Sequence, residues 1–220
     1  QYNQLWDDIT LQCRGLVTDN EGNVVAYPFK KFFNIEENKH TPTERFEVYE
    51  KMDGSLGILF FYEGKWVVAT RGSFTSPQAV KAREMLDTKY NLESIPKGYA
   101  TLFEIIYPEN RIVVNYGVEK VTFLSAVLNG TYKWNSTDDT ELHWSTSLMI
   151  FKSNGIHESD VVKTEQHFNF SDELYKSLKE KNETNKEGFV LRFQPGNFRM
   201  KIKFEEYVRL HKIMTNLSTT

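Results

Sequence analysis

Short runs in which apolar and polar residues alternate recur along most of the chain. They are rich in Val, Ile, Phe and Tyr and are bounded by turn formers, which is typical of strands with one buried face. Glu63-Gly64 and Pro195-Gly196-Asn197 are predicted hairpin turns, because Gly and Asn tolerate a positive φ. The pattern predicts strands at residues 12–18, 23–27, 45–51, 56–62, 65–71, 99–106, 111–115, 120–127, 187–193 and 198–203.

Three segments have helical signals instead. Ser76-Pro77 supplies an N-cap and a first-turn proline before a helix predicted at 78–90. Ser171, followed by two acidic residues, opens a helix to about residue 181, and a third helix is predicted from about 204 toward 215. Residues 129–167 are polar and weakly periodic, so the pattern predicts no particular element there.

The composition is that of an ordinary globular protein. Of the 220 residues, 40% are apolar and 26% are charged, which suits one catalytic unit. No apolar run is long enough to cross a bilayer and the first residues do not resemble a secretory leader, so no membrane partner is expected. The lone Cys13 suits a reducing compartment, and we expect a cytoplasmic monomer, in the host cytoplasm if the protein is viral.

The net charge of -3 argues against a protein that coats nucleic acid through its overall charge. Phosphate groups would therefore have to meet a local cluster of basic residues.

Lys51 stands at the end of a predicted strand, directly before Met52-Asp53-Gly54-Ser55. A lysine held there projects its amine from a rigid edge, and the amine could attack a phosphate if the site kept it neutral. The alternative is a plain hairpin turn with a solvated lysine beside it.

Further charged residues follow at strand positions. Glu104 lies within the apolar run Leu102 to Ile106, and Glu187 precedes a second such run. A buried carboxylate normally needs a partner or a metal, although a strand-end charge more often points to water. Lys201 and Lys203 are two residues apart, so both amines should lie on one face of a strand, where an anion would relieve their repulsion.

These blocks, Lys-x-Asp-Gly, Phe-Glu, Glu-Gly and Lys-x-Lys in this order, resemble the motifs of covalent nucleotidyltransferases. The chain is most similar to the bacteriophage T4 RNA ligase 1 family of ATP-dependent RNA ligases. The resemblance rests on Cys13-Arg14-Gly15, on Lys31-Phe32-Phe33-Asn34, on KMDGS with Leu56, on FEIIYPENRIVVNY from Phe103 and on KIKFEEYVRLHKI from Lys201.

The resemblance implies an α+β nucleotidyltransferase (ATP-grasp-like) fold, with two antiparallel β-sheets and flanking helices around a nucleotide cleft. Residues 1–220 would be the adenylyltransferase domain, without the C-terminal domain that commonly shapes RNA choice in this family. Lys51 would become adenylated by ATP and pass AMP to an RNA 5′-phosphate, which a 3′-hydroxyl then attacks. Implied partners are RNA ends in RNA or tRNA repair and a fused or associated end-healing kinase/phosphatase.

The resemblance also implies roles for individual residues. Catalytic roles fall to Lys51, Glu104, Glu187, Lys201 and Lys203. A Mg²⁺ or Mn²⁺ ion would be held, through water, by Asp53, Glu104 and Glu187. Nucleotide contacts are implied for Arg14, Lys31, Phe33, Glu50, Lys51, Gly54, Arg71, Glu104, Glu187, Lys201, Lys203 and Tyr207.

Three other interpretations remain open. The plainest is a β-rich interaction domain whose charges are incidental, which would have to explain all five blocks as coincidence. A capping-type guanylyltransferase would use GTP, but Leu56 stands where DNA ligases and capping enzymes usually carry arginine. A module that binds nucleotide or RNA ends without ligating them would need no reactive lysine. The five histidines lack the spacing of a zinc site.

Overall fold

The computed structural model of the protein describes residues 5–39, 41–129, 141–194 and 196–217. The chain divides into two compact units, each built from segments that are distant in sequence. The first unit comprises residues 1–31, 55–105 and 120–161, and the second comprises residues 32–54, 106–119 and 162–220.

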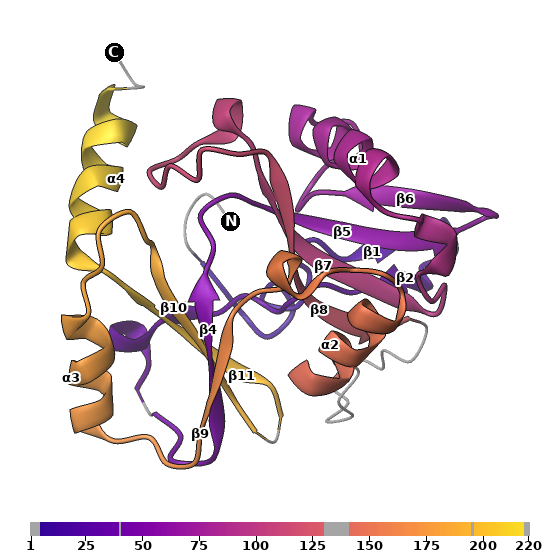
Figure 1. The fold of residues 1–220 in the computed structure, drawn as a ribbon. Helices are drawn as coiled ribbons and strands as arrows, with labels where there is room; N and C mark the ends of the chain where they lie inside the picture. Colours follow the sequence, from indigo (N-terminus) through magenta and orange to yellow (C-terminus); the bar gives the residue numbers. More distant parts are fainter. Residues whose placement is uncertain (1–4, 40, 130–140, 195, 218–220) are drawn as a thin grey trace. The chain divides into compact units, whose positions relative to one another are not determined.

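The first unit is built on a four-stranded sheet in the order β6-β5-β7-β8. A separate two-stranded sheet, β1-β2, belongs to the same unit (Figure 1). Its elements are β1 (Val17–Thr18), β2 (Val24–Ala26), β5 (Ser55–Tyr62), β6 (Lys65–Ala69), α1 (Pro77–Lys89), η2 (Leu92–Ser94), β7 (Tyr99–Ile106), β8 (Lys120–Leu128), α2 (Trp144–Ser153) and η4 (Glu158–Asp160).

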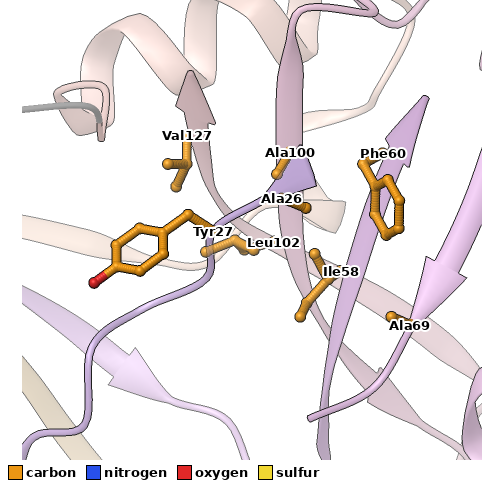
Figure 2. Close-up of a cluster of buried hydrophobic side chains, with 8 residues drawn as sticks. All are labelled: Ala26, Tyr27, Ile58, Phe60, Ala69, Ala100, Leu102 and Val127. Carbon is orange, nitrogen blue, oxygen red and sulfur yellow. The ribbon is translucent and has the colours of Figure 1, made fainter. Parts of the chain in front are cut away.

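Both faces of this sheet are covered. Strand β2 and the residues after it pack on one face, where Tyr27, Ile58 and Leu102 are buried together (Figure 2). Helix α1 contacts β5, β6 and β8, and α2 also contacts β8. Leu56, which follows the lysine box, packs against the cluster of Figure 2, so it is a core residue of this unit.

The second unit is built on a five-stranded sheet in the order β3-β11-β10-β4-β9. Its pairs are antiparallel except β3 with β11, which is parallel. Its elements are β3 (Phe33–Asn34), η1 (Ile35–Glu37), β4 (Phe46–Lys51), η3 (Pro108–Asn110), β9 (Thr164–His167), α3 (Asp172–Glu180), β10 (Gly188–Phe193), β11 (Phe198–Lys203) and α4 (Glu205–Leu217).

The two faces of this sheet differ in chemistry. Leu178 of α3 packs with Phe46, Leu191 and Met200 in an apolar cluster on one face. Because side chains alternate along a strand, the intervening residues occupy the other face. The three central strands place there Glu47, Tyr49, Lys51, Val190, Arg192, Arg199, Lys201 and Lys203.

The expected α+β class is confirmed, while several expected elements differ. Residues 111–115 form no strand, because the amides of Val113 and Val114 donate to the Asp53 carboxylate instead of to a neighbouring strand. The strand expected at 12–18 is reduced to Val17–Thr18, and one expected at 65–71 ends at Ala69. Helix α2 and strand β9 lie in the segment where no element was predicted.

The expected turn at Glu63-Gly64 is present, with φ values of 47° and 79°. In the other expected turn, Gly196 and Asn197 also have positive φ, and Pro195 lies outside the described residues. Within the described ranges, no helix has the length and apolar character needed to span a bilayer.

Candidate active site

Lys51 is the last residue of β4 and lies in one row with two residues of the neighbouring strands. Gly188 of β10 pairs with Lys51 on one side and with Lys203 of β11 on the other. The two lysines therefore flank a glycine at one end of the polar face. With no side chain between them, both amines can reach the same acceptor.

That acceptor is Glu187, the residue before Gly188. Its two carboxylate oxygens accept from different amines, Oε2 from Lys51 Nζ and Oε1 from Lys203 Nζ, each at 2.8 Å. The Glu187 side chain is only 4% exposed, whereas those of Lys51 and Lys203 are 21% and 27% exposed. Two ammonium groups offset the cost of burying this carboxylate, so the three side chains form one charge-assisted cluster.

The backbone conformation at position 188 requires glycine. Its φ is +141°, a value that L-residues rarely adopt, and an added Cβ would collide with the carbonyl oxygen of Ile202. Glycine at this position thus lets the chain enter β10 close to β11, and this places Glu187 beside Lys51.

Asp53, two residues after Lys51, is held by three protein donors. Its Oδ2 accepts from the amides of Val113 at 2.9 Å and Val114 at 2.7 Å, and its Oδ1 accepts from the Tyr207 hydroxyl at 2.7 Å. The Asp53 amide donates to the Tyr116 hydroxyl at 2.8 Å. Asp53 is 3% exposed, so these contacts tie the turn after the lysine to the 113–116 segment and to α4.

Tyr207 contacts both parts of the site. Its hydroxyl binds Asp53, and its ring lies 4.9 Å from Lys203 Nζ, within cation–π range. Burial raises the pKa of Tyr207, as do the nearby Glu187 carboxylate and the hydrogen bond to Asp53. The phenol therefore stays protonated and acts as a donor.

The remaining expected residues of this unit are divided between the two faces of the sheet. Lys201 pairs with Val190 and lies on the same face as Lys203, as the sequence predicted. Glu50 pairs with Phe189 and therefore faces away from Lys51. Phe33 pairs with Met200, on the side away from Lys201. Gly54 follows Asp53 in the turn that leaves β4.

The first unit carries the other expected residues. Glu104 is a half-buried residue of β7 that pairs with Leu56 of β5. Lys31 Nζ lies 5.5 Å from the centre of the Trp6 ring. Arg14 and Arg71 are close enough to influence each other: burial lowers the pKa of Arg14, and the like charge of Arg71 lowers it further. Of the basic residues expected to bind phosphate in this unit, Arg14 and Arg71 thus lie near each other.

The three carboxylates expected to hold a metal ion differ in their contacts. Both oxygens of Asp53 are occupied by protein donors, which leaves it poorly suited to a metal or to metal-bound water. Glu187 faces two amines at the polar end of the sheet, and Glu104 is partly open to solvent. Among the residues that the structure describes, no cluster of three or more His, Cys, Asp or Glu side chains forms a ready metal site.

The sequence did not indicate the contacts of Val113, Val114 and Tyr116. All three lie in the FEIIYPENRIVVNY block, whose apolar residues were interpreted as a strand. The resemblance of this block to the family was the one sequence signal that it belongs to the site. Its apolar pattern indicated a strand, and so gave no sign that the Val113 and Val114 amides donate to the Asp53 carboxylate.

The structure thus joins the lysine of the Lys-x-Asp-Gly block, the glutamate of the Glu-Gly block and a lysine of the Lys-x-Lys block in one cluster on an α+β scaffold. A family model described as RNA ligase matches residues 12–208. The chain therefore belongs to this RNA ligase family.

Three curated relatives agree with this assignment. A putative RNA ligase of Thermovibrio ammonificans is 33% identical over 50% of this chain and 32% of its own length. The RNA ligase of Rhodothermus phage RM378 is 24% identical over 94% of this chain and 61% of its own length. A putative bifunctional polynucleotide kinase/RNA ligase of Autographa californica nuclear polyhedrosis virus is 27% identical over 93% of this chain and 31% of its own length. The chain thus matches less than two thirds of each relative.

Solved structures share the fold. An archaeal ATP-dependent RNA ligase superposes with a TM-score of 0.62 at 18% identity, covering 87% of this chain and 52% of the other. A putative ATP-dependent DNA ligase from Aquifex aeolicus superposes with a TM-score of 0.64 at 17% identity, covering 100% of this chain and 66% of the other. The scaffold is thus the nucleotidyltransferase fold of ligases.

Proposed function

We propose that this chain is the adenylyltransferase part of an ATP-dependent RNA ligase and that Lys51 is its nucleophile. The observation that carries this proposal is the cluster of Lys51, Glu187 and Lys203, in which one buried carboxylate holds two amines 2.8 Å from its oxygens. A surface lysine beside a hairpin turn would have no such partner. Membership of the RNA ligase family supports assigning this reaction to the cluster.

In the first step the neutral Lys51 amine attacks the α-phosphorus of ATP. A phosphorus–nitrogen bond forms, the bond to the bridging oxygen breaks, and pyrophosphate leaves with the electron pair. An oxygen of the RNA 5′-phosphate then attacks the phosphorus of the bound AMP, the phosphorus–nitrogen bond breaks, and the Lys51 amine leaves and takes up a proton. Finally, the 3′-hydroxyl loses its proton and attacks the 5′-phosphorus, and AMP leaves as the phosphodiester forms. Such transfers depend mainly on alignment and on neutralising charge at the leaving group.

The residues of the second unit supply alignment and charge. Glu187 fixes the direction of the Lys51 amine and stabilises its ammonium form in the free protein, so the proton has to leave before attack. Lys203 and Lys201 lie on the same face and bind phosphate oxygens. The resemblance implies that Arg14, Lys31 and Arg71 also bind phosphate groups of the substrates.

A divalent ion, Mg²⁺ or Mn²⁺, belongs to this proposal. Glu187 would hold it through water, the resemblance implies the same role for Glu104, and Asp53 would instead position the Lys51 turn. Such an ion supplies charge neutralisation on the phosphates and disfavours a neighbouring ammonium.

We further propose that the substrate is broken RNA, such as tRNA, with a 5′-phosphate and a 3′-hydroxyl. A relative described as a bifunctional polynucleotide kinase/RNA ligase supports this, because a kinase supplies 5′-phosphates. An end-healing kinase/phosphatase, fused or separate, would then act before this chain.

The test is incubation with α-labelled ATP and Mg²⁺, followed by denaturing electrophoresis and mass spectrometry. Label should appear on Lys51 and be lost in Lys51→Ala, while the exposed Lys65→Ala control keeps it. Label from GTP rather than ATP would favour a capping-type enzyme. A wild-type protein that takes no label from either nucleotide would make the chain a binding module.

A further inference from the structure

Arg14 and Arg71 of the first unit form a pair of like charges without a counter-charge. Among the described residues, neither guanidinium has a hydrogen bond or an ion pair, and the charged group that acts on Arg14 is Arg71. Arg14 is half-buried and Arg71 is exposed. Holding two cations together costs free energy, and an anion bound to both would recover it.

The backbone keeps this pair together. Gly15 has a φ of +82°, and a Cβ added there would lie 3.1 Å from Pro28 Cγ and 3.6 Å from Arg71 Cα. The backbone of Gly15 therefore lies within van der Waals reach of the backbone of Arg71, and a side chain at Gly15 would be strained by its positive φ and crowded by Pro28. The close approach of the two arginines is a feature of the fold.

The loop that carries Arg71 is closed by hydrogen bonds and presents an aromatic ring. Thr70 bonds to the Ser73 carbonyl oxygen through its amide at 2.8 Å and its hydroxyl at 3.1 Å. The Thr70 hydroxyl also lies 3.1 Å from that of Ser76, the N-cap of α1. Phe74, inside this hydrogen-bonded loop, is 56% exposed. A large apolar ring is thus held in solvent three residues from Arg71.

We propose that Arg14, Arg71 and Phe74 bind the single-stranded RNA substrate, with the two guanidinium groups on phosphate oxygens and the Phe74 ring stacked on a nucleobase. Cations that follow the backbone and an aromatic face for a base are the features by which proteins hold single strands. A local site of this kind is needed in a chain whose net charge is -3. The proposal rests on the proposed function and extends the two arginines from the nucleotide to the RNA.

The test separates RNA binding from the reaction with ATP. Self-adenylation is measured without RNA, transfer of AMP from the isolated adenylated protein to a 5′-phosphorylated oligoribonucleotide is measured separately, and affinity for that RNA is measured by fluorescence anisotropy. The variants are Phe74→Ala, Phe74→Trp and, as a matched control, Val80→Ala, which removes a 59% exposed apolar side chain from α1.

Phe74→Ala should weaken RNA binding about tenfold and slow AMP transfer at low RNA concentration, with self-adenylation unchanged. Phe74→Trp should preserve binding, and Val80→Ala should have no effect. Arg71→Ala should lower the dependence of RNA affinity on salt by about one phosphate contact.

Wild-type RNA affinity in Phe74→Ala would overturn the proposal. An equal loss of self-adenylation and RNA transfer would also overturn it, because the ring would then serve ATP. If the wild-type protein bound RNA through Phe74 but never became adenylated, the proposed function would fail while this site stood.

Discussion

The hydroxyl of Tyr207 donates a 2.7 Å hydrogen bond to the carboxylate of Asp53, although the two residues are 154 positions apart. Asp53 follows the candidate nucleophile by two residues, and Tyr207 lies on α4, directly after the strand of Lys203. Because the Tyr207 ring also contacts Lys203 Nζ, one side chain links the two lysine motifs. The turn after Lys51 is therefore joined to the strand of Lys203 by a residue that lies outside both motifs.

Tyr207→Phe should keep the ring beside Lys203 but remove the donor to Asp53. Leaving a buried acceptor short of a partner costs about 1–3 kcal/mol. We expect lower thermal stability and slower self-adenylation, measured by calorimetry and single-turnover labelling. Tyr90→Phe is the matched control, since it removes a 2.9 Å hydroxyl bond to Asp160 in the first unit. It should cost similar stability and spare adenylation, and equal losses of activity in both variants would argue against a positioning role.

Asp53→Asn distinguishes positioning from metal binding. The Asn oxygen can still accept from the Val113 and Val114 amides, but its amide nitrogen then faces the Tyr207 hydroxyl and cannot accept the hydrogen bond that Tyr207 donates to Asp53. The carboxylate charge is lost as well, so the turn should loosen, at a cost of about 1–3 kcal/mol. We expect slower adenylation with the same Mg²⁺ concentration at half-maximal rate as the wild-type protein. A rise of tenfold or more in that concentration would identify Asp53 as a metal ligand after all.

Most strands of the sheets were predicted correctly from the sequence, because a strand with one buried face has apolar residues at every second position. The alternation in β11 also placed Lys201 and Lys203 on one face, and the pairing with β10 confirms this. The Lys-x-Asp-Gly and Glu-Gly blocks were recognised by resemblance, and the structure joins Lys51 to Glu187.

The contacts that organise the turn could not be predicted in this way. The amides of Val113 and Val114 bind a side chain 60 and 61 residues away, and nothing local in an apolar run distinguishes this from strand pairing. Helix α2 was missed because it lies in a stretch that is polar and weakly periodic as a whole, and because the helix itself buries only Ser147 and Phe151. Hydrogen bonds between distant residues, and helices that bury few side chains, produce no recognisable pattern in a single sequence.

Glu187→Gln should remove the charge that holds the two amines while keeping the side-chain shape. Lys51 and Lys203 would then lose the carboxylate charge that both contact on either side of Gly188, so both should move away from the productive geometry. We expect single-turnover adenylation to fall about a hundredfold or more.

The control for this change is Glu183→Gln, which removes a carboxylate paired with Lys186 at a more exposed position. It should change adenylation by less than about twofold, because exposed ion pairs contribute little. Near-normal adenylation in Glu187→Gln would show that the cluster is only structural.

Gly188→Ala tests the backbone that brings the cluster together. The new Cβ would meet the Ile202 carbonyl oxygen at a φ of +141°, so β10 would have to shift away from β11. A strained residue of this kind costs about 1–3 kcal/mol, and each kcal/mol lowers the melting temperature of a chain this size by about 2–4 °C. Gly98→Ala is the control, because a Cβ there meets nothing within 4 Å. We expect a fall of several degrees and a loss of adenylation for Gly188→Ala and neither for Gly98→Ala. A Gly188→Ala protein that melts and reacts as the wild type does would mean that the row of Lys51, Gly188 and Lys203 tolerates a side chain at its centre.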